Sequence, residues 1–160
     1  MTEDTLTDFA LAAFREDGRW EVAPLPPRVG DGLTSLVATL RQLPAEGGAL
    51  GLVSVSDDFA VLARVTGTDV RVLLSDVTAA AEVPFAAEVL EAAGEGGGED
   101  LETVRPAGDL EIVADLGLDA MEMAAICDDI DLYPDELLGR IAGRLGFGEE
   151  FDRAVDVATH

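Results

Sequence analysis

The sequence predicts an α+β fold: a five-stranded antiparallel sheet with helices, followed by a C-terminal helical segment. Three observations predict it. Short apolar runs separated by short turns are typical of antiparallel strands. Apolar residues recur at helical spacing between the second and third of these runs. Helical patterns then dominate the last third of the 160 residues.

The first two strands form a predicted hairpin. Residues 9–14 are apolar at every position, which is typical of a strand that is buried on both faces in the middle of a sheet. Residues 16–18, Glu-Asp-Gly, are a hairpin turn signal. The second strand carries Trp20 and Val22. We expect the prolines within residues 24–27 to end it, because proline cannot donate to a ladder.

A helix and three further strands are expected next. Apolar residues recur at helical spacing over 33–43, and Pro44 is expected to end this helix. Three apolar runs predict strands at 50–55, 59–65 and 70–74. The connections at 56–58 and 67–69 are too short for a crossover, so these strands are expected to be antiparallel neighbours.

An Ala-rich stretch over 77–93 predicts a second helix, with Pro84 suited to a first turn. The resulting order is β-β-α-β-β-β-α. It predicts two layers, with the helices packed on one face of the sheet. Longin-like and roadblock-like domains share this order of elements, although a shared fold does not establish a shared function.

Charge and composition divide the chain. Residues 1–81 carry 12 acidic and six arginine side chains, a net charge of −6, whereas residues 82–160 carry 21 and four, a net charge of −17. The change coincides with an acidic, glycine-rich stretch that is typical of a linker. We expect an α+β module over 1–92, a linker over 93–108 and an acidic helical module over 109–160.

The last module contains three predicted helices. Asp119, with an acid three residues later, is a capping-box pattern that opens a helix to about Asp129. Pro134 opens a second helix, which Gly146 ends, and a short amphipathic piece over 151–155 follows. About fifty residues of short helices bury too little surface for a core of their own. We expect them to pack on the first module, on each other or on a partner.

Composition excludes several classes of function. The net charge of −23, with all ten basic residues arginine, disfavours direct binding of nucleic acid or of an anionic membrane. Cys127 is the only cysteine, and the only histidine is the last residue, His160. This excludes an internal disulfide, zinc sites and Ser-His-Asp or Cys-His catalysis. No cofactor is expected. The N-terminus resembles no signal peptide and no apolar run reaches 18 residues, so we expect a cytoplasmic protein.

The densest charge near predicted structure is the acidic loop, defined here by four residues: Asp128, Asp129, Asp131 and Asp135. Carboxylate oxygens suit Ca²⁺ or Mg²⁺, but a calcium loop that begins at Asp129 requires glycine where Pro134 stands. The favoured interpretation is a solvated loop followed by acids that complement a helix dipole. A further interpretation is that the loop docks onto a basic partner.

A second candidate is the strand–helix corner that contains Ser75, Asp76 and Thr78. Ser75 or Asp76 suits a helix N-cap, and this local role explains either residue. The functional alternative is a partner or ligand site at the corner. Cys127, on the apolar face of a predicted helix beside two aspartates, is expected to be a structural thiol rather than a reactive one.

Several segments resemble one family of actinobacterial proteins. They are 59–65, 70–80, 84–86, 108–110 and 131–136, and the most specific is the run Ser75-Asp-Val-Thr-Ala-Ala80. The family is that of the tRNA adenosine deaminase-associated proteins, and the resemblance extends from Asp8 to Val155. It implies an association with the tRNA-editing deaminase and supplies no catalytic residues. The zinc signature of the deaminase itself, His-x-Glu with Pro-Cys-x-x-Cys, is absent from this chain.

Three functional hypotheses follow. The leading one is a non-enzymatic cytoplasmic accessory protein. Its acidic C-terminal half binds a basic surface on a protein partner, such as the tRNA adenosine deaminase, and the four aspartates of the acidic loop make the contacts. The second is a homodimeric scaffold of longin or roadblock type. The third is a metal- or carboxylate-dependent enzyme that acts on a small molecule.

Overall fold

The structure is a computed structural model that describes residues 7–26, 28–29, 32–43, 46–94, 102, 104–129 and 131–159. Several features singled out in the sequence lie outside these residues: Pro27, Pro44, His160 and, within the expected linker, residues 95–101 and 103.

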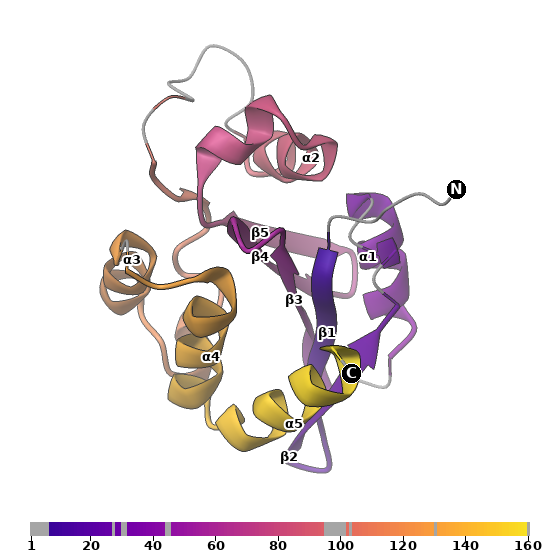
Figure 1. The fold of residues 1–160 in the computed structure, drawn as a ribbon. Coiled ribbons are helices and arrows are strands. Elements are labelled where there is room, and N and C mark those ends of the chain that lie inside the picture. Colours follow the sequence, from indigo (N-terminus) through magenta and orange to yellow (C-terminus); the bar gives the residue numbers. More distant parts are fainter. Residues whose placement is uncertain are drawn as a thin grey trace.

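The described residues form one sheet of six antiparallel strands, in the order β2-β1-β3-β4-β5-β6 (Figure 1). The strands are β1 Thr7–Glu16, β2 Arg19–Leu25, β3 Glu46–Val55, β4 Phe59–Thr66, β5 Asp69–Leu74 and β6 Ala107–Gly108. The prediction of five strands is therefore wrong. The sixth strand has two residues and pairs with the end of β5, and so short a piece has no periodicity for sequence analysis to detect.

Helices lie on both faces of the sheet, as Figure 1 shows. They are α1 Leu33–Arg41, the 3₁₀ helix η2 Val77–Ala81, α2 Pro84–Ala92, the 3₁₀ helix η3 Ala114–Leu116, α3 Ala120–Asp128, α4 Pro134–Leu145 and α5 Gly148–Thr159. The first three pack on one face, called here the first face. The apolar stripes of α3, α4 and α5 pack on the other, the second face. The helices of the first 92 residues lie on one face, as predicted for that module, and the C-terminal helices pack on the opposite face as a third layer.

The central strands explain the third layer. In β1, Ala10 and Ala12 join the apolar core of the first face, whereas Leu11 and Ala13 join the core of the second. All four side chains are fully buried. Because an apolar strand must be covered on both sides, the second face requires helices that the first 92 residues do not provide.

The edge strand β2 differs from its prediction, because it continues through Pro24 to Leu25 instead of ending at the prolines. β2 pairs only with β1, so a residue without an N–H group is tolerated on its outer side. The hairpin turn before it has Asp17 and Gly18 at positive φ, as the turn signal predicts.

The C-terminal helices begin largely where the sequence places them. The Asp119 carboxylate accepts the backbone N–H of Glu122 at 2.9 Å and caps α3, and Gly146 ends α4 in the left-handed conformation. α5 is longer than the predicted piece at 151–155. None of the described helices is long and apolar enough to cross a lipid bilayer.

Candidate functional site

The acidic loop joins the end of α3 to the first turn of α4. Asp128 is the last residue of α3, and Asp129 follows as its C-cap. The Asp129 carboxylate accepts the backbone N–H of Asp131 at 3.1 Å, which holds the loop in a turn. Asp135 lies in the first turn of α4, where a carboxylate interacts favourably with the helix dipole. The side chains of Asp128, Asp131 and Asp135 are exposed.

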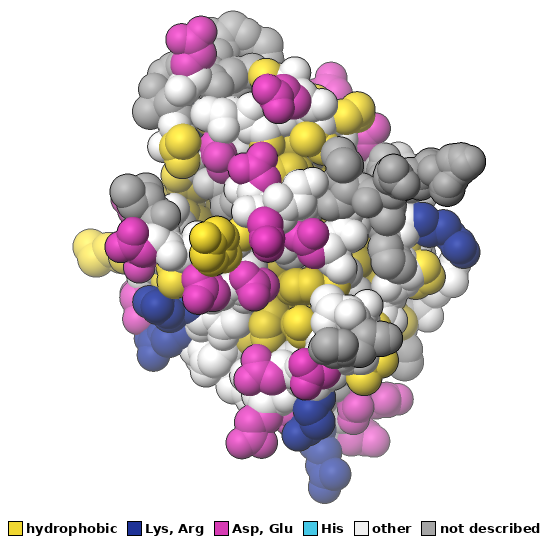
Figure 2. All heavy atoms as spheres, in the orientation of Figure 1, with side chains coloured by type: hydrophobic (Ala, Val, Ile, Leu, Met, Phe, Trp, Pro, Cys, Tyr) yellow, Lys and Arg dark blue, Asp and Glu magenta, His cyan; other side chains and the backbone are white. Residues whose placement is uncertain are grey.

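The carboxylates of the acidic loop are exposed but do not converge on a common point. Among the described residues, no three carboxylate, thiol or imidazole groups lie close enough to hold a metal ion. Figure 2 shows acidic side chains spread over the face that carries α4 and α5, with basic side chains toward its periphery. The loop therefore belongs to a wide negative surface.

Two large apolar side chains, one on α3 and one within the acidic loop, are exposed, and sequence analysis did not identify either of them. Met121 on α3 is 82% exposed, and Tyr133, the N-cap residue of α4, is 61% exposed. Both lie off the apolar stripes of their helices, which is the signal that distinguishes them from core residues. An exposed aromatic ring among charged groups is a common feature of protein interfaces.

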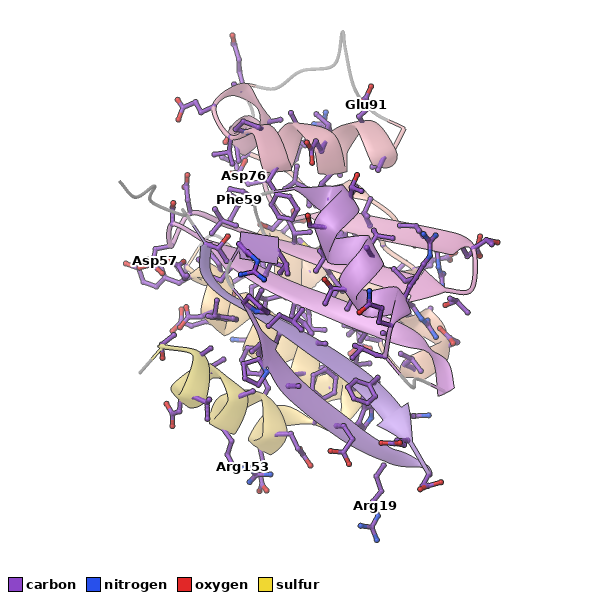
Figure 3. The ribbon with its side chains drawn as sticks, turned by 90° about the vertical axis from the view of Figure 1, so that its right-hand side faces the viewer. Arg19, Asp57, Phe59, Asp76, Glu91 and Arg153 are labelled. Carbon is purple, nitrogen blue, oxygen red and sulfur yellow. The ribbon has the colours of Figure 1, made fainter. Side chains whose placement is uncertain are left out.

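The strand–helix corner has its polar groups engaged within the chain. Asp76 caps η2, because its Oδ1 accepts the backbone N–H of Thr78 at 2.9 Å and the Thr78 hydroxyl at 2.7 Å. The Ser75 hydroxyl oxygen accepts the N–H of Ala60 at 2.9 Å and ties the end of β5 to β4. Figure 3 shows Asp76 between the sheet and α2. This geometry is that of a structural corner.

Cys127 is partly buried, and its thiol pKa is raised to about 11 by that burial and by the neighbouring charge of Asp128. A thiol with so high a pKa is almost wholly protonated at neutral pH and is a poor nucleophile.

One buried charged group was not identified from the sequence. Arg64 on β4 is only 6% exposed and points to the second face. Its guanidinium donates to the carbonyl oxygen of Ile112 at 2.9 Å and forms a bidentate ion pair with the Asp115 carboxylate of η3. The hydrogen bond from Arg64 holds the pKa of the Asp115 carboxyl below its ordinary value of 3.8. We call these three groups the arginine clamp.

A hollow of about 240 Å³ opens beside the clamp at the β1–β2 end of the sheet. Its lining includes Arg15, Trp20, Gly48, Arg64 and Asp115. The Arg15 guanidinium lies 4.8 Å from the centre of the Trp20 ring. The centres of the Phe147 and Trp20 rings are 4.7 Å apart. The hollow thus combines two arginines, one aromatic ring and one carboxylate.

Comparison with known proteins assigns the family. Residues 8–148 match the family described as Rv3753c-like tRNA adenosine deaminase-associated protein. Protein Rv3753c of Mycobacterium tuberculosis (strain ATCC 25618 / H37Rv) is 40% identical over 156 residues, which cover 96% of this chain and 90% of that relative. No solved structure matches the chain. The chain therefore belongs to the Rv3753c-like tRNA adenosine deaminase-associated protein family.

Proposed function

We propose that this protein is a non-catalytic accessory of the tRNA adenosine deaminase and binds that enzyme through the acidic loop. The observation that carries the proposal is the family match over residues 8–148, whose description names an association with the deaminase and no activity of its own. The acidic loop is the proposed contact because three of its four carboxylates are exposed beside the exposed ring of Tyr133.

Charge complementarity supports the choice of surface. An enzyme that acts on tRNA contacts phosphates with lysine and arginine, so it carries a basic surface. The second half of this chain, residues 82–160, has a net charge of −17, which is complementary to a basic surface on the enzyme. In this proposal the acidic loop occupies part of the surface that tRNA uses, so the accessory and tRNA exclude one another.

The test is isothermal titration of the protein against the deaminase from the same source, at low and at moderate salt. We expect micromolar or tighter binding that weakens by about tenfold as salt screens the charges. The variant D128N/D129N/D131N/D135N is expected to bind at least about tenfold more weakly. A second titration with tRNA present is expected to lower the apparent affinity.

The matched control removes four exposed acids from the other half of the chain: E16Q/E21Q/D58N/D69N. It changes net charge equally and is expected to bind as the wild type does. Equal weakening in both variants would show that net charge, and not the acidic loop, governs binding. An absence of heat and of a complex at either salt concentration would contradict the proposal.

A further inference from the structure

The hollow beside the arginine clamp has the features of a preformed binding site. These features are independent of the partner proposed above. It collects two of the ten arginines of a chain with net charge −23. The surrounding acids repel anions from most of the surface. Against this background, the side chains of two arginines, Arg15 and Arg64, line the wall of one hollow.

Arg64 gives the hollow a fixed wall. Its side chain is only 7% exposed and is held from two directions by Ile112 and Asp115. Held in this way, the guanidinium needs no reorganisation to meet a ligand, and preorganisation of this kind reduces the entropic penalty of binding. Asp115 pairs with Arg64, so Arg15 supplies the remaining charge among the described side chains that line the hollow.

Arg15 supplies that second charge. Its guanidinium lies over the Trp20 ring at 4.8 Å, a cation–π contact that orients the planar group while leaving its N–H edge for hydrogen bonds. Within the described part of the chain, no carboxylate pairs with it. A guanidinium edge matches the paired oxygens of a carboxylate or a phosphate.

Size and shape limit the ligand. A volume of about 240 Å³ is below the range of about 300–1,000 Å³ that holds a cofactor or a drug-sized molecule. The Trp20 ring already contacts Phe147 and Arg15, so little of it remains for a stacked base. The overall negative charge disfavours polyanions. These limits exclude a nucleotide and favour a small anion.

We propose that the hollow lined by Arg15, Trp20, Arg64 and Asp115 binds a small oxyanion, inorganic phosphate or a short carboxylate, with Arg15 as its main contact. The position is at the β1–β2 end of the second face, where the clamp joins the sheet to η3. Binding there stabilises the folded state by an amount that grows with the logarithm of the ligand concentration once this exceeds Kd.

Trp20 provides a direct readout, because it is the only tryptophan in the chain and lies in the wall of the hollow. The full-length protein is titrated with sodium phosphate and, separately, with sodium acetate, while sodium chloride keeps the ionic strength constant. Constant ionic strength is necessary because screening of the net charge alone stabilises an acidic protein. We expect a saturable change in Trp20 emission at about millimolar ligand and a rise in melting temperature.

The key variant is Arg15→Gln, and its matched control is Arg19→Gln. Arg19 lies on the same hairpin and points away from the molecule (Figure 3). Both variants lose one positive charge, and both side chains lie outside the core, so folding is checked simply by circular dichroism. We expect R15Q to weaken binding by about tenfold or more, R15K to restore part of it, and R19Q to change it by less than about twofold.

The outcomes separate clearly. A response to phosphate alone, to acetate alone or to both supports the proposal and identifies the oxyanion. The proposal is overturned if neither phosphate nor acetate, up to about 20 mM at constant ionic strength, gives a saturable change in Trp20 emission beyond that in sodium chloride alone. Equal weakening by R15Q and R19Q also overturns it, because binding would then follow net charge. None of these results depends on the deaminase, so failure here leaves the proposed function untouched.

Discussion

The two faces of the sheet are covered in different ways. On the first face, α1, η2 and α2 pack through a core of apolar side chains alone. On the second face, the covering layer comes from the C-terminal part of the chain, and the arginine clamp joins this layer to β4. Arg64 is the only buried charged side chain among the described residues. One layer is held by hydrophobic burial, and the other adds an ion pair whose arginine is buried and whose aspartate is exposed.

The difference shows how a remote layer is positioned. The helices of the first face are joined to their strands by short connections, so their placement follows from chain connectivity. The C-terminal layer lacks that constraint. An ion pair adds little net stability, but a wrong placement would leave the buried guanidinium of Arg64 without its partner, and an unpaired buried charge is strongly unfavourable. We infer that the clamp specifies where the C-terminal layer docks.

The strongest test of the comparison removes one core leucine from each layer. Leu36 of α1 and Leu138 of α4 are both fully buried. We expect Leu36→Ala and Leu138→Ala each to lower the free energy of unfolding by about 2–5 kcal/mol. Both variants should keep one cooperative transition, because β1 contributes side chains to both cores.

Urea unfolding is followed by far-ultraviolet circular dichroism and by Trp20 fluorescence. Coincident curves for both variants confirm a single folding unit. A separate early transition in Leu138→Ala alone would show instead that the C-terminal layer unfolds by itself. Met121→Ala is the control, since a side chain that is 82% exposed contributes little to either core.

The next largest effect concerns the clamp. Asp115→Ala leaves the buried guanidinium of Arg64 without its counter-ion and is expected to destabilise by about 1–2 kcal/mol, because the 61% exposed Asp115 side chain already exchanges part of its interaction with water. Arg64→Met removes the buried charge itself and is expected to be less destabilising than Asp115→Ala. Urea unfolding at neutral pH measures both. A larger loss of unfolding free energy in Arg64→Met than in Asp115→Ala would contradict a positioning role for the pair.

The clamp also predicts a dependence on pH. The pKa of Asp115 is lowered in the folded protein by the hydrogen bond from Arg64, whereas in the unfolded chain it returns to its ordinary value of 3.8. Its stabilising contribution is therefore complete above that value and is lost as the pH falls through the lower folded pKa. The difference in unfolding free energy between wild type and Asp115→Ala should shrink from pH 7 to about pH 3. A constant difference would exclude this linkage.

The same contrast explains what could be predicted from the sequence. Strands β1, β3, β4 and β5 and helix α1 have clear periodicities and short connections, so their type and order were predictable. The two-residue strand β6 was not predictable, because it depends on a contact between segments far apart in the chain. The apolar run over residues 9–14 predicted burial on both faces, but packing of the C-terminal helices on this sheet was only one of three alternatives.

The candidate sites were likewise predictable where they depend on local sequence and unpredictable where they depend on long-range contacts. The acidic loop is a run of one residue type and is visible in the sequence, and the cap at Asp76 is a local pattern. The clamp joins Arg64 to Asp115, which are 51 residues apart, and a single arginine in an apolar strand was the only available signal. Whether that arginine is buried and paired depends on the third layer, which the sequence did not place.

A smaller effect compares the helix caps of the two layers. Asp76 caps η2 on the first face, and Asp119 caps α3 on the second. Alanine at either position removes an acceptor for a backbone N–H and should lower the free energy of unfolding by about 1 kcal/mol, while asparagine should restore most of it. Asp76 also accepts the Thr78 hydroxyl, so its loss is expected to be the larger. Chemical denaturation of the four variants checks this order.

The smallest expected effect separates the clamp from an ion pair of similar appearance. Arg144 of α4 pairs with Glu122 of α3, but their side chains are 49% and 43% exposed. Water solvates both groups when the pair is broken, and the ordering of two long side chains offsets most of the attraction. Glu122→Gln is therefore expected to leave the unfolding midpoint unchanged at moderate salt, whereas Asp115→Ala lowers it. If both variants lowered the midpoint equally, burial of Arg64 would not be what distinguishes the second face.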